Sequence, residues 1–331
     1  MRWRYRFFTL LLPGLCASFA EAELPEARAL LERMARASRM LNYDAVFVSI
    51  CGSEVESMRV IHQAGASGER ERLVALTGMA REVIRQGDQV TWILPADRAV
   101  MLGRGSPRNL LTATFTQPVD AIARHYHFTI LGGDRIAGRP SWVVGISPKR
   151  SDRYGYRLWI DSSVHLPLRS QTLDGNGTVL AQVMFTSLAL PAAIPAPDLV
   201  PGISGRGFVQ YASEDQGEDP ASHAGGWRVG WLPKGFTMQR HEQHAYPDHP
   251  EATDHQVYSD GLASISVFIE RYSPASAPLG YSTLGSLNTY STMSYEHQLT
   301  LVGEVPTLTL RRIASSLTPA GPAQAGLGAQ P

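Results

Sequence analysis

The stretch GYRLWIDSSVHLPLRSQTLDGNGTVLAQVMF, residues 155–185, decides the fold of this chain. It predicts three consecutive β-strands, at 154–161, 166–173 and 178–188. A Pro-containing bend separates the first two strands, and the turn DGNG separates the last two. Connections this short favour antiparallel hairpins, because a parallel pair needs a crossover of a dozen or more residues.

The alternation of side chains in these strands predicts one continuous apolar face. One face of the first strand holds Tyr154, Tyr156, Leu158 and Ile160, and the other holds Arg153, Arg157, Trp159 and Asp161. In the last strand the shared face holds Val179, Ala181, Val183 and Phe185. We therefore expect a sheet that covers something apolar.

The same strand pattern runs through most of the first half of the chain. An amphipathic helix is expected first, at 25–41, and a short helix from Pro118 interrupts the strands. The further strands are expected at 43–50, 56–63, 70–76, 80–86, 89–95, 98–102, 127–131 and 141–147. So long an antiparallel meander must twist and curve, and with few helices to cover its concave side it leaves an apolar hollow.

A Pro-rich segment divides the chain at 191–205, where Pro191, Pro195, Pro197 and Pro201 exclude a central strand and favour a semi-rigid linker. Beyond it, strands are expected at 206–211, 227–231, 236–244, 254–259, 262–272 and 297–303, and a helix from Pro306 to Leu317. The chain is thus predicted to be mainly β with α: a curved antiparallel open barrel at 23–190, a smaller α+β domain at 206–318, and a disordered tail at 319–331.

The first 22 residues are typical of a secretory signal peptide. Three arginines precede a short apolar run, and Ala20-Glu21-Ala22 is a small-x-small cleavage site. Bulky Leu15 before Cys16 disfavours lipidation at that cysteine, and cleavage after Ala22 leaves Cys51 alone, so no disulfide is expected. The mature chain would have 27 basic against 29 acidic residues, a net charge near −2 that does not favour binding to nucleic acid.

The sequence contains no common catalytic motif. The nucleophile elbow, the phosphate-binding loop and the C-x-x-C pair are absent, and the spaced glycine pairs lack a third glycine. We therefore expect neither an enzyme nor a cofactor. A polar cluster at 241–255 contains residue types that ligate zinc, namely His241, Glu242, His244, Asp248, His249, Asp254 and His255. The cluster does not match the H-E-x-x-H motif of zinc proteases, so we expect a solvated loop. Metal-dependent hydrolysis is the competing hypothesis.

Four segments together resemble the MucB/RseB family of periplasmic regulators of the envelope-stress sigma factor. They are DRYGYRLWIDSSVHLPLRSQTLDGNGTVLAQVMFTSL, WRVGWLPKGF, YSDGLASISVFIE and LVGEVPTLTLRRIASSL. The first segment also resembles the lipoprotein carrier LolA, whose fold the amino-terminal domain of the family shares. The His-rich loop and the Gly/Ala-rich tail are not features of that family.

The resemblance implies a function and two partners. The smaller domain of the family binds the periplasmic part of a membrane-spanning anti-sigma factor and protects it from site-1 proteolysis. Lipopolysaccharide or lipoprotein acyl chains would occupy the hollow of the first domain and cause release. A periplasmic lipid or lipoprotein carrier is the alternative, and a homo-oligomer is compatible with either function.

The family has no short motif that transfers residue by residue, so the expected sites are faces of the sheets. For an apolar ligand we expect Trp92, Trp142, Leu158, Ile160, Val183 and Phe185. For the partner polypeptide we expect Trp231, Phe236, Tyr258, Phe268 and Arg271. Each residue also suits ordinary core packing, because buried apolar side chains dominate any such set.

Overall fold

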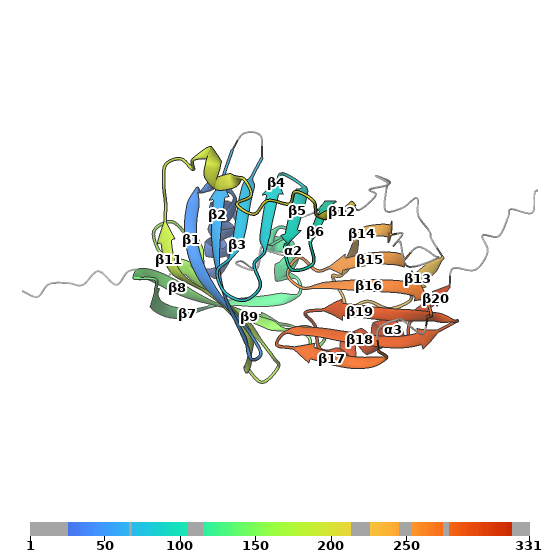
Figure 1. Ribbon diagram of the computed structural model, residues 1–331. Helices are drawn as coiled ribbons and strands as arrows, with labels where there is room; N and C mark the ends of the chain where they lie inside the picture. The colour runs from blue at the N-terminus through green and yellow to red at the C-terminus, as the bar shows by residue number, and fades with distance from the viewer. Residues whose placement is uncertain are drawn as a thin grey trace, which may run out of the picture.

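The computed structural model describes residues 26–65, 68–104, 115–212, 226–244, 253–273 and 278–319. The expected signal peptide and all of the expected tail except Pro319 lie outside these residues. Within them, no helix is long and apolar enough to cross a membrane. We call the described residues 26–212 the first unit and 226–319 the second unit; the two lie side by side in Figure 1.

The first unit contains a twelve-stranded, strongly curved sheet (Figure 1). Its order is β12-β6-β5-β4-β3-β2-β1-β11-β10-β9-β8-β7, and all pairs are antiparallel except β12 with β6. The expected hairpins of the 155–185 stretch are confirmed as β9, β10 and β11. The strand bounds are β1 Tyr43–Cys51, β2 Glu54–Gln63, β3 Arg70–Ala75, β4 Glu82–Gln86, β5 Gln89–Leu94, β6 Ala99–Arg104, β7 Tyr126–Ile136, β8 Arg139–Pro148, β9 Gly155–Asp161, β10 Pro167–Leu173, β11 Val179–Ala189 and β12 Val209–Ala212.

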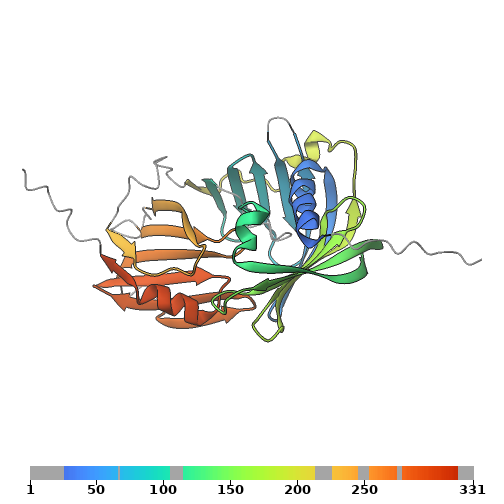
Figure 2. The same ribbon diagram turned by 180° about the vertical axis from the view of Figure 1, so that it is seen from behind.

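Two helices cover one face of this sheet, on the side turned to the viewer in Figure 2. Helix α1 (Ala27–Met40) buries Leu30, Leu31 and Met34, whose spacing places them on one side of a helix. Helix α2 (Val119–Ala123) begins after Pro118 and buries Val119 and Ile122. Both helices pack on β8 and β9, so the apolar face predicted from β9 is covered by protein.

The other side of β9 is less exposed than its sequence suggests. Trp159, expected on a polar face, is only 5% exposed. Its indole N–H donates to Asp134 Oδ2 at 2.7 Å, and the Arg169 guanidinium lies 4.2 Å from the ring centre. The strand is therefore buried on both faces, because β10, its neighbour, and β7, one strand further along the sheet, supply partners for the ring.

The Pro-rich segment is docked along the outer face of the first sheet. Ile194 and Leu199 pack on Ile61 of β2, and the short 3₁₀ helix η1 (Ala196–Leu199) lies beside β3. Gly202 N–H donates to Glu82 Oε2 at 2.8 Å. The chain then enters β12, so the strand expected at the start of the second domain pairs with β6 of the first sheet. We call residues 194–202 the strap.

The second unit is a six-stranded antiparallel sheet with one helix on one face (Figures 1 and 2). Helix α3 (Thr307–Ala314) buries Leu310 and Ile313 against β16 and β19, and the hairpin expected at Asp260-Gly261 joins β15 to β16. The strands of this sheet are β14 Thr237–His244, β15 Thr253–Ser259, β16 Ser264–Arg271, β17 Gly280–Leu284, β18 Leu287–Ser294 and β19 His297–Gly303. A separate two-stranded sheet consists of β13 Trp227–Val229 and β20 Leu317–Pro319. The hairpin β17–β18 was not predicted, because its Ser- and Thr-rich strands lack apolar alternation.

Candidate binding surfaces

The six residues expected to bind an apolar ligand share one face of the first sheet. Cross-strand partners point to the same side of a sheet, and the register connects Trp92 through Val83, Leu73 and Val60 to Ala45 of β1. Continuing from β1, the list of partners is Phe47 with Phe185, Val183 with Ser170, Ser170 with Leu158, and Ile160 with Trp142. The sequence pattern therefore identified one surface that spans β5 to β8.

That surface is filled by side chains of the protein itself. Leu158 and Ile160 are fully buried beneath α1 and α2, and Phe185 is 3% exposed in a neighbouring cluster with Phe47. Trp92, Trp142 and Val183 are partly buried at the edges of these clusters. A ligand could reach Leu158 only by displacing α1 or α2, because a packed interior leaves no room beside existing side chains.

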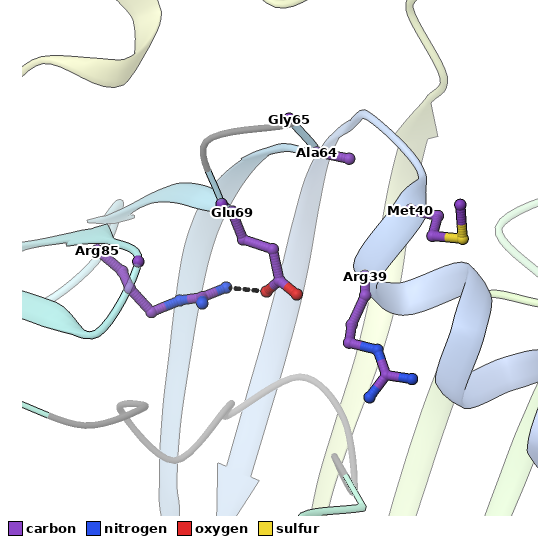
Figure 3. Close-up of a pocket in the computed structure, with 8 residues that line it drawn as sticks. Arg39, Met40, Ala64, Gly65, Glu69 and Arg85 are labelled. Carbon is purple, nitrogen blue, oxygen red and sulfur yellow. Dashed lines mark hydrogen bonds and ion pairs between the residues drawn. The ribbon is translucent and has the colours of Figure 1, made fainter.

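A pocket of about 620 Å³ lies at the rim of the same face (Figure 3). Arg39 and Met40 at the end of α1 form one wall, and Gly65, Glu69 and Arg85 form part of the other. Arg85 Nη2 donates to Glu69 Oε2 at 2.6 Å and to Glu71 Oε2 at 3.1 Å. The rim is thus polar and charge-balanced, whereas the rest of the face is apolar.

Next to this pocket, three ionisable residues from neighbouring strands are buried in the sheet: Tyr43, His62 and Glu71. His62 is 1% exposed, stacks on Tyr43 with ring centres 4.7 Å apart, and has Nδ1 2.8 Å from Leu41 O. Burial, reinforced by the charge of Glu71, raises the pKa of Tyr43 well above its ordinary value, so the phenol stays neutral. Sequence reasoning missed this group, because its members come from three different strands.

The residues expected to bind a partner do not form a single surface. Phe236 and Tyr258 are buried in the core of the second unit, and Trp231 packs against that core under Arg312, 4.0 Å from its ring centre. Tyr258 pairs with Ile265 on the face that α3 covers, whereas Phe268 pairs with His255 on the opposite face, which no helix of the described residues covers. Phe268 is therefore the aromatic residue of this set that is placed to meet a partner on the sheet.

The polar residues at 241–255 do not converge on a metal in the part of the chain that the structure describes. His241 Nε2 lies 3.0 Å from Asp254 Oδ1, and burial raises the pKa of Asp254 although His241 opposes that rise. His255 lies on the other face of the sheet, stacked on Phe268 with ring centres 4.2 Å apart. Asp248 and His249 lie outside the described residues, and among those described no three such side chains could hold an ion.

A buried ion pair joins the two units, and sequence reasoning did not identify it. Arg153, in the turn before β9, donates from Nη1 to Asp260 Oδ2 at 2.6 Å and from Nη2 to Lys234 O at 2.7 Å. Tyr126 Oη donates to the same Asp260 oxygen at 2.9 Å. Arg153 is 3% exposed and Asp260 1% exposed. We call Tyr126, Arg153 and Asp260 the latch.

The surroundings keep Arg153 and Tyr126 in the states that this geometry requires. Burial alone would lower the pKa of Arg153, but its hydrogen bond to Asp152 and the charge of Asp260 outweigh burial and raise it. Burial raises the pKa of Tyr126, so its hydroxyl remains a donor. Asp260 Oδ1 accepts the backbone N–H groups of Leu262 and Ala263. Both carboxylate oxygens of Asp260 are therefore used.

Further contacts between the units lie around the latch. Asn288 Nδ2 donates to Tyr154 Oη at 2.8 Å, and Thr309 Oγ1 donates to Asp152 O at 2.9 Å. Cys51 Sγ lies 3.2 Å from Leu284 O, where the turn after β1 meets the β17–β18 turn. These contacts involve backbone and small polar groups, so the sequence pattern contains no signal for them.

Comparison with known proteins shows which family has this architecture. Residues 26–203 match the MucB/RseB N-terminal domain, and residues 221–318 match the MucB/RseB C-terminal domain. The chain is similar to the sigma factor AlgU regulatory protein MucB of Pseudomonas aeruginosa, with 32% identity covering 95% of this chain and 98% of the relative. It is also similar to the sigma-E factor regulatory protein RseB of Haemophilus influenzae, with 29% identity covering 94% and 97%.

Solved structures agree with these matches. The complex of Pseudomonas aeruginosa MucA and MucB matches with a TM-score of 0.71 and 29% identity, covering 89% of this chain and 99% of the solved one. A crystal structure of MucB in complex with MucA(peri) matches with a TM-score of 0.68 and 28% identity, covering 90% and 100%. The predicted fold class, a mainly β chain with a curved open sheet and a smaller α+β part, is confirmed.

Proposed function

The chain belongs to the MucB/RseB family, and from this we propose that it is a periplasmic negative regulator of an envelope-stress sigma factor. It binds the periplasmic region of a membrane-spanning anti-sigma factor and shields that region from site-1 proteolysis. The observation that supports this most directly is that both family domains are present, in order, across nearly the whole described chain. The solved complexes of a relative with MucA and with MucA(peri) suggest the class of partner.

Binding rather than catalysis is the role that the described side chains suit. The open face of the second sheet, centred on Phe268, is the surface that we assign to the polypeptide. Arg271 lies on the α3 side of the sheet, like Ile269, so we assign this exposed residue to a contact at the end of β16. Phe236, Tyr258 and Trp231 would act by supporting that sheet from its packed side. No catalytic residue and no cofactor are assigned.

Lipopolysaccharide or lipoprotein acyl chains are the release signal in this proposal. The apolar face of the first sheet offers the chemistry that an acyl chain needs, and the polar rim pocket lies at one end of it. We assign the ligand to the face that holds Trp92, Trp142, Leu158, Ile160, Val183 and Phe185. The carrier alternative gives no role to the second unit, whose turn at Asp260 is buried against the first unit.

Binding and proteolysis measurements test the proposed function. The protein from residue 23 onward is titrated with the periplasmic segment of the single-span anti-sigma factor of the same organism, and the site-1 protease is then added. We expect a stable complex, slowed cleavage, and faster cleavage once lipopolysaccharide is present. Absence of a complex would rule out the regulatory function, and lipid transfer that persists without residues 206–318 would favour the carrier.

A further inference from the structure

The latch connects the apolar face of the first unit to the second unit through one residue. The ring of Tyr126 is 1% exposed and belongs to the same cluster as Leu158, Ile160 and Met34. Its hydroxyl leaves that cluster and binds Asp260. Any movement of the ring within the apolar cluster therefore changes a hydrogen bond between the units.

Helix α2 makes the same connection through packing. Ile122 is fully buried in the apolar cluster, and a Cβ placed on Gly261 would lie 3.2 Å from Ile122 Cγ1. The backbone N–H of Thr116, just before α2, donates to Gly261 O at 3.1 Å. Leu262, next to Gly261, packs on the same cluster. A five-residue helix is thus held between the apolar face and the Asp260 turn.

The second unit meets the latch with its own core. The Arg153 guanidinium lies 5.6 Å from the ring centre of Tyr126 and 5.3 Å from that of Phe236. Phe236 is buried in the core of the second unit. Arg153 therefore lies between an aromatic residue of each unit and pairs with a carboxylate of each, Asp152 in the first unit and Asp260 in the second.

Because the cluster is closely packed, an acyl chain cannot enter it while α2 and Tyr126 keep their positions. An acyl chain inserted beside Leu158 needs space that the packed cluster does not contain, so α2 and Tyr126 must shift with it. The filled state and the closed latch then exclude one another, and a ligand that fills the face favours the open latch. The acyl chain would thus act on the second unit without touching it.

We propose that the Tyr126–Arg153–Asp260 latch couples occupancy of the apolar face to release of the second unit, so that acyl-chain binding opens the latch and an open latch strengthens acyl-chain binding. This inference rests on the proposed lipid-sensing function. It adds the residues that transmit the signal. Coupling between two equilibria is reciprocal. If bound ligand shifts the equilibrium between closed and open latch by a certain factor, opening the latch must raise the affinity for the ligand by the same factor.

The variant Asp260→Asn tests this reciprocity. The amide keeps the shape of the side chain and an oxygen for the N–H groups of Leu262 and Ala263. It removes the carboxylate of the second unit that pairs with Arg153 and leaves Asp152, the partner within the first unit, in place. Binding of a synthetic triacylated lipopeptide to the protein from residue 23 is measured by fluorescence titration. We expect the variant to bind the lipopeptide about tenfold more tightly than the wild type.

Glu82→Gln is the matched control, because it breaks a buried Arg–carboxylate pair of the first unit that lies away from the latch. Glu82 is 2% exposed and its Oε1 lies 2.9 Å from Arg72 Nη2, on the face that the strap covers. General loosening of the first unit would affect both variants alike. Lipopeptide affinity of Glu82→Gln is expected to remain at the wild-type value.

Tyr126→Phe is a milder second variant, which leaves the ring in place and removes only the hydrogen bond to Asp260. It is expected to bind lipopeptide about two- to tenfold more tightly, the range that one hydrogen bond typically contributes. Circular dichroism shows whether each variant is folded, and if Asp260→Asn is not, Tyr126→Phe decides. Unchanged or weaker binding by the folded variant overturns the coupling alone. Failure of the wild type to bind lipopeptide overturns lipid sensing and the coupling with it.

Discussion

At the scale of single residues, Asp161 holds together the bend between β9 and β10. Its Oδ1 accepts the backbone N–H groups of Ser163 and Val164, and its Oδ2 accepts Arg139 Nε–H. Burial alone would raise the pKa of Asp161, but the hydrogen bonds from Arg139 and the two amides outweigh burial and lower it. The bend predicted from the sequence thus depends on one buried carboxylate.

Asp161→Asn is therefore expected to destabilise the protein by about 1–3 kcal/mol at pH 7. Because the folded pKa is depressed, the ionised carboxylate stabilises the fold above the ordinary value near 3.8, and this contribution is lost as the pH falls through the folded pKa. Urea unfolding from pH 7 to pH 3 measures it. A difference between wild type and variant that stays constant across this range would contradict the assignment.

Phe268 is an aromatic residue of the second unit that does not belong to its buried core. It lies on the uncovered face of the second sheet, stacked on His255. If that face binds the anti-sigma segment, Phe268→Ala weakens the complex by about 1–3 kcal/mol, as for an aromatic contact at an interface. Titration calorimetry measures the change. Leu308→Ala, at a 77% exposed position on α3, is the control and should bind as the wild type.

At the scale of elements, the strap shows how a Pro-rich segment becomes part of a fold. Its prolines prevent it from joining a central strand, but Ile194 and Leu199 give it two apolar anchors on Ile61. Arg72 Nη1 donates to Asp198 O at 3.3 Å, and Gly202 N–H binds the Glu82 carboxylate. The segment expected to be a linker is therefore held to β2, β3 and β4.

Gly202→Ala is expected to loosen the strap. A Cβ at this position would lie 2.5 Å from Arg72 Nη2 and 3.0 Å from Glu82 Oε1, so the buried pair must separate, at a cost of about 1–3 kcal/mol. Limited proteolysis should cleave the variant faster within 190–205. Gly175→Ala, where no atom lies within 4 Å of the new Cβ, is the matched control and should retain wild-type resistance. Equal cleavage of all three proteins would show that Gly202 is not an anchor.

At the scale of the whole molecule, several polar contacts join the two sheets. The latch, the Asn288–Tyr154 hydrogen bond and the Cys51–Leu284 contact lie on different parts of the boundary. Removing one charge of a buried ion pair typically costs about 3–5 kcal/mol of stability. Each of the other polar contacts between the units is a single hydrogen bond, which typically contributes about 0.5–1.5 kcal/mol. The ion pair should therefore dominate the coupling of the two units.

We accordingly expect the wild type to unfold in a single calorimetric transition, and Asp260→Asn in two, as each unit unfolds by its own core. Glu82→Gln should lower the midpoint and keep one transition, since its ion pair lies within the first unit. A single transition in Asp260→Asn, shifted like that of the control, would mean that the latch only stabilises and does not join the units.

The sequence by itself determined most of the strands, the antiparallel hairpins of the 155–185 stretch and the apolar face that they share. Alternation along a strand and short turns are local, and that pattern alone predicted a shared apolar face holding Leu158, Ile160 and Phe185. Tertiary structure decided what covers that face, where the Pro-rich segment docks, and which residues join the units. Arg153 and Asp260 lie 107 residues apart, and each resembles an ordinary turn residue until it pairs with the other. Pairing at such a separation depends on how the two folded units pack against each other, and no local pattern of residues predicts that packing.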